Sequence, residues 1–356
     1  MEKTSDNKYT IGITQGDING IGYEVIFKAL SDPDMLKDCS VVIYGSPKIA
    51  AFHRKQVNLS NIIVNNVTDV ADIVKNTINI INVCDDNTRV ELGNNTIQAG
   101  ECSLAALHRA QADLKNGAID ILVNAPINYF NLVEAGFRIP SIADSLAQEF
   151  GCRNFVQMFL GSNLKVATVS SPMPISAVGD VLTTEKILWK IRTLAKVLHD
   201  DFTIRKPRIA VVGLNPFASD FGTFGREEGD KIHPAILKAN EEGIAVFGPY
   251  NADGFFAEEL YSKFDGVLCM AYEQALMAAR LVEKNNAVAY VGGLPAICTA
   301  PTHGPAFDIA GKGEAVETSM RNAIYTAIDI YRNRKILEGI VPLRKQTEHE
   351  ADKKIC

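Results

Sequence analysis

The sequence predicts an α/β fold with two domains and mostly parallel sheets. Short apolar runs rich in β-branched residues alternate with amphipathic segments of roughly 10–17 residues, a pattern typical of βαβ units. The chain of 356 residues is too long for one ordinary hydrophobic core, so two domains are expected. Because no internal repeat or long linker separates them, we expect short crossings, with both chain ends in one domain.

The expected strands and helices follow one another from the N-terminus onward. The apolar runs predict strands at residues 11–14, 40–44, 78–83, 119–123, 165–170, 208–214, 244–247 and 266–270. Helical periodicity predicts helices that begin near Tyr23 and Lys48 and others at residues 105–115, 184–200, 230–242 and 316–332. Asn124-Ala125-Pro126 ends the fourth strand, because proline cannot continue it.

Composition excludes several classes of protein. Apolar residues make up 47% and charged residues 22%, as in globular proteins. A net charge of −6 argues against a nucleic-acid-binding protein, which needs a basic face. No apolar run approaches the ~20 residues that a membrane helix requires, and MEKTSDNKYT lacks the features of a signal peptide. We therefore expect a cytoplasmic protein without membrane or nucleic-acid partners.

The cysteines and histidines form no local motif. The seven cysteines include no CxxC pair, so we expect reduced thiols. The six histidines are far apart, and no HExxH is present. We interpret His53, His108 and His233 as surface or helix residues, and Glu227-Glu228 with Asp230 as a solvated helix N-terminus rather than a metal cluster.

Two glycine-containing loops are candidates for ligand binding. Residues 16–22 (GDINGIG) lie between a strand and a helix, where backbone N–H groups could bind an anion; a tight turn in which Asp17 caps the backbone explains the pattern equally well. The spacing differs from GxGxxG, so a Rossmann site is not indicated. Residues 303–313 (HGPAFDIAGKG) could wrap a nucleotide base and ribose, or simply connect to the following helix.

Five segments together resemble the 4-hydroxythreonine-4-phosphate dehydrogenase family of pyridoxal phosphate synthesis. They are ITQGDINGIGYE, NAPIN, RKPRIAVVGLNP, FGPYNADGFF and HGPAFDIAGKG, and the similarity runs from about Ile11 to Arg334. The resemblance implies a fold like that of isocitrate and isopropylmalate dehydrogenases, with an interdomain cleft and a homodimer. It also implies NAD-dependent oxidation of a small phosphorylated metabolite, then decarboxylation assisted by a divalent metal such as zinc or magnesium.

The resemblance also suggests where the domains divide. We expect residues 8–145 and 300–336 to form one α/β domain and residues 146–299 a second, dimerising domain. The charged segment 337–356 is expected to be disordered.

At the family's metal positions the sequence departs from the family pattern. The segments that match the three metal histidines place Pro172, Phe217 and Tyr272 there. Proline and phenylalanine side chains cannot coordinate a cation, and a neutral tyrosine is a poor ligand near pH 7. The resemblance therefore predicts that the metal ligands are absent.

The substrate and phosphate positions are replaced as well, so no catalytic residue of the family is intact. The resemblance places them at residues without charge, namely Tyr129, Ile142, Ala143, Ala289 and Cys298. Arg280 is the only cation retained. We expect Cys298 to be a quiet, buried thiol, because no histidine or lysine stands beside it in the sequence.

The nucleotide loop follows the family more closely. Thr302 and Pro305 replace an aspartate and a threonine, but the other positions match. The resemblance implies that NAD would contact His303, Gly304, Asp308, Ala310 and Gly311.

Three hypotheses for function follow. The chain could be a working dehydrogenase whose metal site has moved to Asp144, Glu273 or Asp17. It could be a pseudoenzyme that keeps the fold and the dimer, with or without nucleotide binding, and pairs with an active relative. It could also be a structural variant without a ligand. The sequence favours the last two together over the first.

Overall fold

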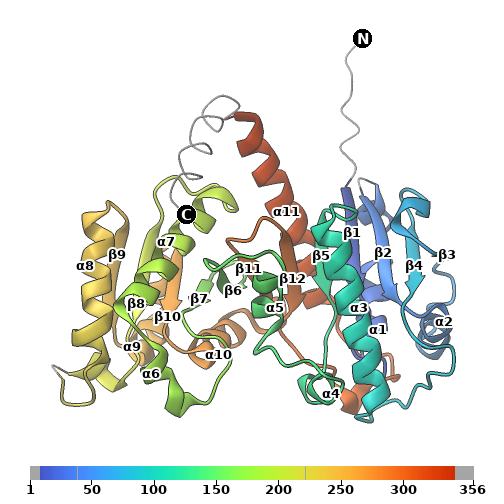
Figure 1. Cartoon of the computed structure of the whole chain (residues 1–356), viewed down its shortest axis with the longest axis horizontal. Coiled ribbons are helices and arrows are strands. Elements are labelled where there is room, and N and C mark those ends of the chain that lie inside the picture. Colours follow the sequence, from blue (N-terminus) through green and yellow to red (C-terminus); the bar gives the residue numbers. More distant parts are fainter. Residues whose placement is uncertain (1–8, 38, 221, 341–356) are drawn as a thin grey trace.

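One twelve-stranded sheet runs through the molecule (Figure 1). The computed structural model describes residues 9–37, 39–220 and 222–340. The strand order is β3-β4-β2-β1-β5-β12-β11-β6-β7-β10-β8-β9. The predicted α/β class and the mostly parallel arrangement are confirmed, although the strands form a single sheet rather than separate ones.

The strands divide between two halves of the sheet. The first half contains β1 (Tyr9–Thr14), β2 (Cys39–Gly45), β3 (Val64–Val67), β4 (Ile78–Asn82), β5 (Ile121–Asn124) and β12 (Ile297–Pro301). The second half contains β6 (Val156–Leu160), β7 (Lys165–Thr168), β8 (Arg208–Val212), β9 (Ala245–Tyr250), β10 (Gly266–Cys269) and β11 (Val288–Gly292). These halves lie to the right and left of Figure 1.

The helices connect these strands and cover the sheet. They are α1 (Gly22–Ala29), α2 (Pro47–Gln56), α3 (Ile97–Lys115), α4 (Tyr129–Glu134), α5 (Ile142–Glu149), α6 (Val178–Val181), α7 (Thr184–Asp200), α8 (His233–Glu241), α9 (Ala252–Ala257), α10 (Tyr272–Glu283) and α11 (Thr318–Ile340). Within the part of the chain that the structure describes, no helix is long and apolar enough to cross a membrane.

The sequence prediction missed the centre of the sheet. β11 pairs antiparallel with β12 and β6, and β6 pairs antiparallel with β7. Of these strands only β7 was expected, and β3, α4, α5, α6, α9 and α10 were also missed. The predicted helix at residues 105–115 begins earlier, at Ile97, because the Thr96 hydroxyl accepts a hydrogen bond from the Ala99 backbone.

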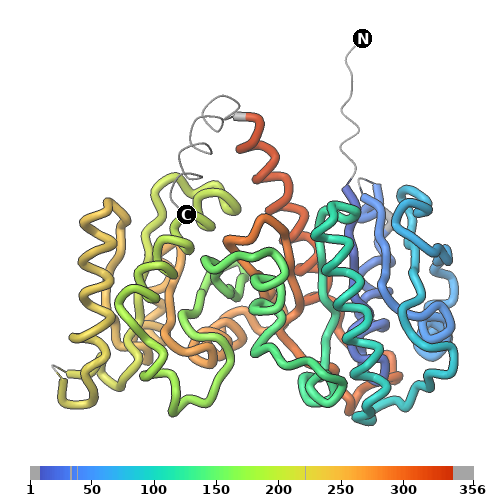
Figure 2. The backbone as a smooth tube through the Cα atoms, viewed as in Figure 1, coloured from blue at the N-terminus to red at the C-terminus, as the bar shows by residue number. Residues whose placement is uncertain are grey.

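The end of the chain differs from the expectation in one respect. Helix α11 continues to Ile340, so residues 337–340 are helical and do not belong to a disordered tail. The rest of that predicted tail, residues 341–356, lies outside the described residues. Figure 2 shows α11, in red, rising between the two halves of the molecule.

The hydrophobic core is continuous on one face of the sheet and split on the other. Successive residues of β2 point to opposite faces, as a pleated strand requires: Val41 belongs to the continuous cluster, which also includes residues of α1, α7 and α11. Val42 belongs to a separate cluster with α3 and α5. A third cluster, around α9 and α10, covers the same face of the second half. The domain division at residues 145 and 300 stays a prediction, because one sheet crosses both halves.

His53 lies on α2 as expected but is buried rather than at the surface. Its Nε2 lies 2.8 Å from the Ile18 carbonyl oxygen, and its ring packs against Tyr23 and Phe52. Burial lowers the pKa of the His53 imidazole to about 4, since a charged ring would lose its hydration. The neutral ring therefore donates its Nε2 proton to the carbonyl.

Acidification should destabilise the protein through His53. The folded pKa is depressed below the unfolded value of about 6.5, so this stability is complete above pH 6.5 and is lost as pH falls toward 4. Between pH 7 and 5 we expect a loss of about 2 kcal/mol from this residue. Urea unfolding measures the free energy of unfolding at both pH values. For His53→Gln, the decrease between pH 7 and 5 should be smaller than in the parent by about 2 kcal/mol. His108→Gln, at an exposed position on α3, should show the same decrease as the parent. Equal pH dependence of His53→Gln and the parent would contradict this account.

Candidate functional site

The three segments that the resemblance assigns to metal ligands meet at the carboxyl ends of neighbouring strands. β10 is parallel to both β7 and β8, so their carboxyl ends lie side by side. Pro172, Tyr272 and Phe217 follow β7, β10 and β8 respectively. The Tyr272 backbone N–H donates to Ser170 Oγ at 3.1 Å, which ties the first two segments together. The sequence assignment thus joins three segments that are neighbours in space.

The side chains at these three positions do not form a metal centre. Phe217 is 60% exposed and packs its ring on Phe224, whereas Tyr272 packs edge-on against Phe159. Burial raises the pKa of the Tyr272 hydroxyl, which keeps it protonated. Across residues 9–37, 39–220 and 222–340, no group of three His, Cys, Asp or Glu side chains could hold a metal ion. The residues present do not fit the divalent metal of the family.

The carboxylates considered for a relocated metal site lie in separate environments. Asp17 is buried, which raises the pKa of its carboxyl, and it accepts hydrogen bonds from the Asn19 backbone and the Asn131 amide. Asp144 accepts hydrogen bonds from Ser141 and Ser171, and Glu273 is exposed on α10. The described part of the chain therefore brings no relocated site together.

The loop after β8 is held by a buried carboxylate. Glu228 is buried and accepts hydrogen bonds from the Leu214 and Asn215 backbone N–H groups, both at 2.8 Å. The interpretation of Glu227-Glu228 as a solvated helix N-terminus is wrong for Glu228, because the loop supplies the hydrogen bonds that replace its water. Residues 217–220, none of them glycine, all adopt positive φ values of 43–67°.

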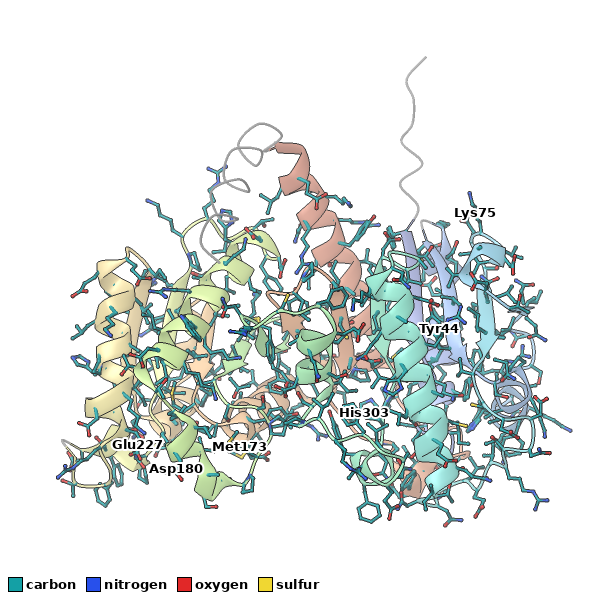
Figure 3. All side chains as sticks on the ribbon, in the orientation of Figure 1. Tyr44, Lys75, Met173, Asp180, Glu227 and His303 are labelled. Atoms are coloured by element: carbon teal, nitrogen blue, oxygen red, sulfur yellow. The ribbon has the colours of Figure 1, made fainter. Side chains whose placement is uncertain are left out.

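A cavity lies where the two separate core clusters meet. Its volume is about 260 Å³. Its wall contains the positions that the resemblance assigned to the substrate and also the start of the nucleotide loop. Figure 3 shows His303, the first residue of that loop, between the two halves of the molecule. Its lining includes Tyr129, Ile142, Ala143, Gln157, Phe159, Tyr272, Ala289, Cys298, His303 and Gly304. We call this cavity the cleft.

The wall of the cleft carries no charged side chain. No Asp, Glu, Lys or Arg belongs to its lining. Burial lowers the pKa of His303, which keeps its imidazole neutral at pH 7. Burial also raises the pKa of Cys298 to about 12, and the Asn124 amide donates to its sulfur at 3.3 Å. The prediction of a quiet buried thiol is confirmed, and the retained Arg280 is exposed on α10, outside this lining.

The nucleotide loop is docked on the turn at residues 16–22. The Ile21 N–H donates to the Pro305 carbonyl at 3.0 Å, and a side chain at Gly20 would lie only 2.6 Å from Pro305. Gly311 adopts a positive φ of 76° against Leu92. His303 and Gly304 reach the cleft, whereas Asp308, Ala310 and Gly311 lie outside its lining. Gly311 thus has a packing role, whereas a side chain at Gly304 would meet no atom within 4 Å.

The structure favours one of the two interpretations of the turn at residues 16–22. All of its residues are buried, Asp17 caps the Asn19 backbone, and Asn19 joins the turn to Glu91 and Thr96 through its side-chain amide. The backbone N–H groups of Gly20 and Ile21 are already paired. This segment is a tight structural turn rather than an open anion site.

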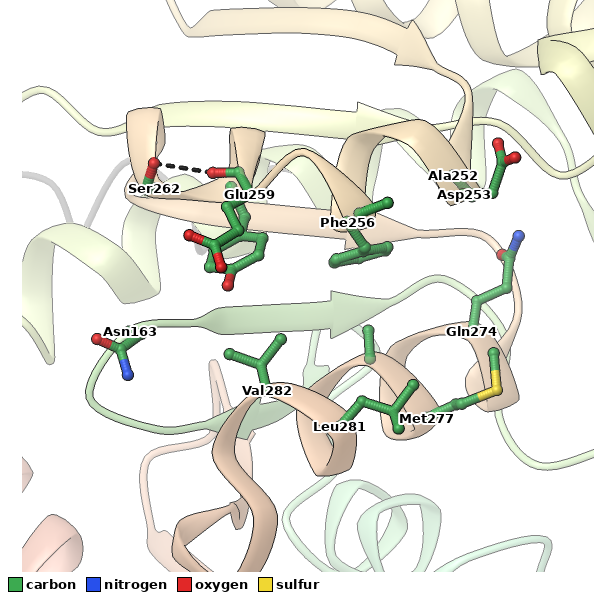
Figure 4. Close-up of a pocket in the computed structure, with 13 residues that line it drawn as sticks. Asn163, Ala252, Asp253, Phe256, Glu259, Ser262, Gln274, Met277, Leu281 and Val282 are labelled. Atoms are coloured by element: carbon green, nitrogen blue, oxygen red, sulfur yellow. Dashed lines mark hydrogen bonds between the residues drawn. The ribbon is translucent and has the colours of Figure 1, made fainter.

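Two further features of the surroundings were missed from the sequence. Gln157 and Phe159 line the cleft from β6, a strand that was not predicted, although the run Phe155–Leu160 is apolar enough to have suggested it. A larger pocket of about 1170 Å³ lies elsewhere, between the segment 252–262 and α10 (Figure 4). It includes none of the predicted site residues, so we keep the cleft as the candidate site.

Strand order and cleft together define a protein class: an α/β protein of the isocitrate dehydrogenase type, with its cleft at the carboxyl ends of central strands. An isocitrate dehydrogenase from Methylococcus capsulatus shares this fold, with a TM-score of 0.50, 16% identity and coverage of 93% of this chain and 88% of that one. The family model for the pyridoxal phosphate biosynthetic protein PdxA matches residues 37–327. This chain belongs to the PdxA family.

Relatives support this assignment over almost the whole length. A 4-hydroxythreonine-4-phosphate dehydrogenase from Bacteroides thetaiotaomicron is 43% identical over 354 residues, covering 98% of this chain and 96% of that protein. One from Sulfurihydrogenibium is 35% identical, covering 91% and 99%. The crystal structure of the Klebsiella pneumoniae dehydrogenase has a TM-score of 0.76 at 28% identity, covering 91% of this chain and 98% of that one.

Proposed function

We propose that this chain is a PdxA-family member that keeps a ligand-binding cleft but lacks metal-assisted oxidative decarboxylation. The observation that carries the proposal is the set Pro172, Phe217 and Tyr272 at adjacent strand ends, none of which can bind a divalent cation at pH 7. A metal ion would polarise the substrate hydroxyl and stabilise the enolate that remains after carbon dioxide leaves. Without ligands for it, that stabilisation is lost.

The cleft also lacks groups that would hold a phosphorylated substrate. Charged or bidentate donors normally bind phosphate, and the lining contains no lysine or arginine. Cys298 and Ala289 occupy the positions that the resemblance assigns to an arginine and an asparagine. The chain therefore lacks both the groups that would hold the metal for decarboxylation and the groups that would bind the substrate phosphate.

Other family properties extend this proposal. NAD is the nucleotide that the family resemblance implies for the loop at 303–313; His303 and Gly304 of this loop reach the cleft, and the loop is fixed on the turn at 16–22. A homodimer and a cytoplasmic location complete the proposed picture of a pseudoenzyme, which pairs with itself or with an active relative.

A turnover assay tests the proposal. The purified chain is mixed with 4-phosphohydroxy-L-threonine and NAD in the presence of magnesium, manganese or zinc, and NADH is followed by absorbance. We expect no NADH formation above a protein-free blank, since removing metal and phosphate contacts together costs several kcal/mol in the transition state, roughly 10³-fold or more. The Bacteroides thetaiotaomicron relative serves as the positive control. Turnover with any of the three metals, at a rate within about tenfold of this relative, would overturn the proposal.

A further inference from the structure

Two cysteines from separate segments of the chain lie together close to the turn at residues 16–22. Cys84 follows β4 at the start of an irregular segment, and Cys102 lies in the first half of α3. Both are buried in the same hydrophobic cluster, and the Cys84 thiol donates a hydrogen bond to the Cys102 sulfur. Both thiols are free. Two thiols in contact are the groups from which a disulfide forms.

Polar side chains hold this pair in place. The Gln15 amide nitrogen donates to the Cys84 sulfur at 3.0 Å and to the Cys102 carbonyl oxygen at 3.2 Å. The amide oxygen of Gln15 accepts a hydrogen bond from the Tyr23 hydroxyl at 2.7 Å. The Thr88 hydroxyl lies 3.7 Å from the Cys102 sulfur. A shared amide and a hydroxyl therefore fix the two sulfur atoms beside each other.

The two thiols differ in acidity. The hydrogen bond from Cys84 lowers the pKa of the Cys102 thiol, whereas the same bond and burial raise the pKa of Cys84. The carboxylates of Asp85 and Glu101 oppose the ionisation of Cys102, but their effect is smaller than that of the hydrogen bond. Because the thiolate is the nucleophile in thiol oxidation, Cys102 is the sulfur that reacts first and Cys84 is its resolving partner.

Other cysteines of the chain have different surroundings. Cys39 and Cys152 donate hydrogen bonds to backbone carbonyl oxygens. Burial raises the pKa of the Cys269 and Cys298 thiols, which keeps both protonated. These four residues therefore serve as internal controls for the reactivity of the pair.

We propose that Cys84 and Cys102 are a redox-sensitive pair that a hydroperoxide oxidises to a disulfide. The Cys102 thiolate attacks one peroxide oxygen, the O–O bond breaks, and the departing oxygen takes up a proton. The Cys84 sulfur then attacks the sulfenic acid of Cys102: the S–S bond forms, the S–O bond breaks, and hydroxide leaves with the Cys84 proton as water. The thiols lose two electrons, which the peroxide accepts.

The position of the pair gives the oxidant a route and the disulfide a consequence. Cys84 is 9% exposed, and residues 85–87, which follow it, are exposed, so a small movement of this segment admits hydrogen peroxide. The bond would join the segment after β4 to α3, next to Gln15, which precedes the turn that holds the nucleotide loop. No step uses the cleft, so the inference does not depend on the proposed function.

Mass spectrometry of the full chain tests the proposal. The reduced protein is incubated with a small molar excess of hydrogen peroxide at pH 7.5, and the remaining thiols are alkylated in denaturant. We expect two fewer alkylated cysteines, a cross-linked peptide pair that contains Cys84 and Cys102, and full reversal by dithiothreitol. Complete alkylation of both residues, or a cross-link between other cysteines instead, would show that the pair is not redox-sensitive.

Serine variants test the order of the two steps. Cys84→Ser keeps the attacking thiol, so the reaction should stop at a sulfenic acid on Cys102, which dimedone traps. Cys102→Ser should consume peroxide at least about tenfold more slowly than the parent. Cys152→Ser, which removes a cysteine outside the pair, should form the same disulfide as the parent. If dimedone labels Cys84 in Cys102→Ser but not Cys102 in Cys84→Ser, the assignment of the attacking thiol is wrong. Should a variant fail to fold, as judged by circular dichroism, the cross-link in the parent chain still decides the proposal.

Discussion

Replacing Arg334 with methionine is expected to lower the free energy of unfolding by about 3–5 kcal/mol, the largest single-residue effect on stability that we predict. Arg334 on α11 forms a buried ion pair with Asp201, with Nε 2.6 Å from the carboxylate. The Tyr290 hydroxyl donates to the same carboxylate at 2.5 Å and accepts a hydrogen bond from Arg334 at 2.9 Å. Without Arg334 the buried charge of Asp201 would lose its cation.

Urea unfolding with a matched control measures this effect. Arg192→Met removes the same type of side chain from an exposed pair with Glu242, and should cost no more than about 1 kcal/mol. The double variant Asp201→Leu with Arg334→Met removes both charges and should recover much of the loss. If Arg334→Met costs no more than Arg192→Met, the network does not stabilise the fold.

This network also bears on the cleft. Tyr290 lies on β11 between Ala289 and Val291, both of which line the cleft from the opposite face of the strand. Asp201 follows α7 and Arg334 lies near the end of α11, so the three side chains fix β11 against two helices. The central strand of the sheet is therefore positioned by groups that take no part in ligand binding.

The sequence predicted every strand that pairs only in parallel except β3, and it missed every strand with an antiparallel neighbour except β7. β8 and β10 are continuous runs of apolar residues bounded by turns, so their own composition indicates a buried strand. β11 and β12 are only five residues long; they pair with each other across a short turn, and each also pairs with a strand far away in the sequence, β6 and β5 respectively. That pairing cannot be inferred from local composition.

In the candidate site, too, residues within matching sequence segments were predicted, whereas contacts between distant parts of the chain were not. Matching segments located Tyr129, Ala289, Cys298 and His303, which the fold then brings to one cleft. The roles of buried polar groups were not predictable, because their partners are set by tertiary contacts. For example, no local sequence pattern indicates what stabilises the charge of Glu228. The backbone N–H groups that do so belong to a loop more than ten residues away.

Restoring histidine at Pro172, Phe217 and Tyr272 together is expected to create a zinc site that binds at least about 100-fold more tightly than the parent chain. The three positions follow parallel strands β7, β8 and β10, whose carboxyl ends are adjacent. Three imidazoles satisfy most of the tetrahedral preference of zinc and leave one position open. Calorimetry at pH 7.5 measures the affinity, and circular dichroism checks that the variant is folded.

Variants that restore only two of the three histidines separate a true site from adventitious binding. Each should bind zinc about tenfold or more weakly than the triple variant, because every lost ligand removes a coordination bond. A folded triple variant with no gain over the parent would show that these positions are not the metal positions, and the proposed function would lose the observation that carries it. If the triple variant binds zinc but forms no NADH, the missing activity would instead be explained by the uncharged cleft. There, Ala289 and Cys298 cannot bind a phosphate through charged hydrogen-bond donors.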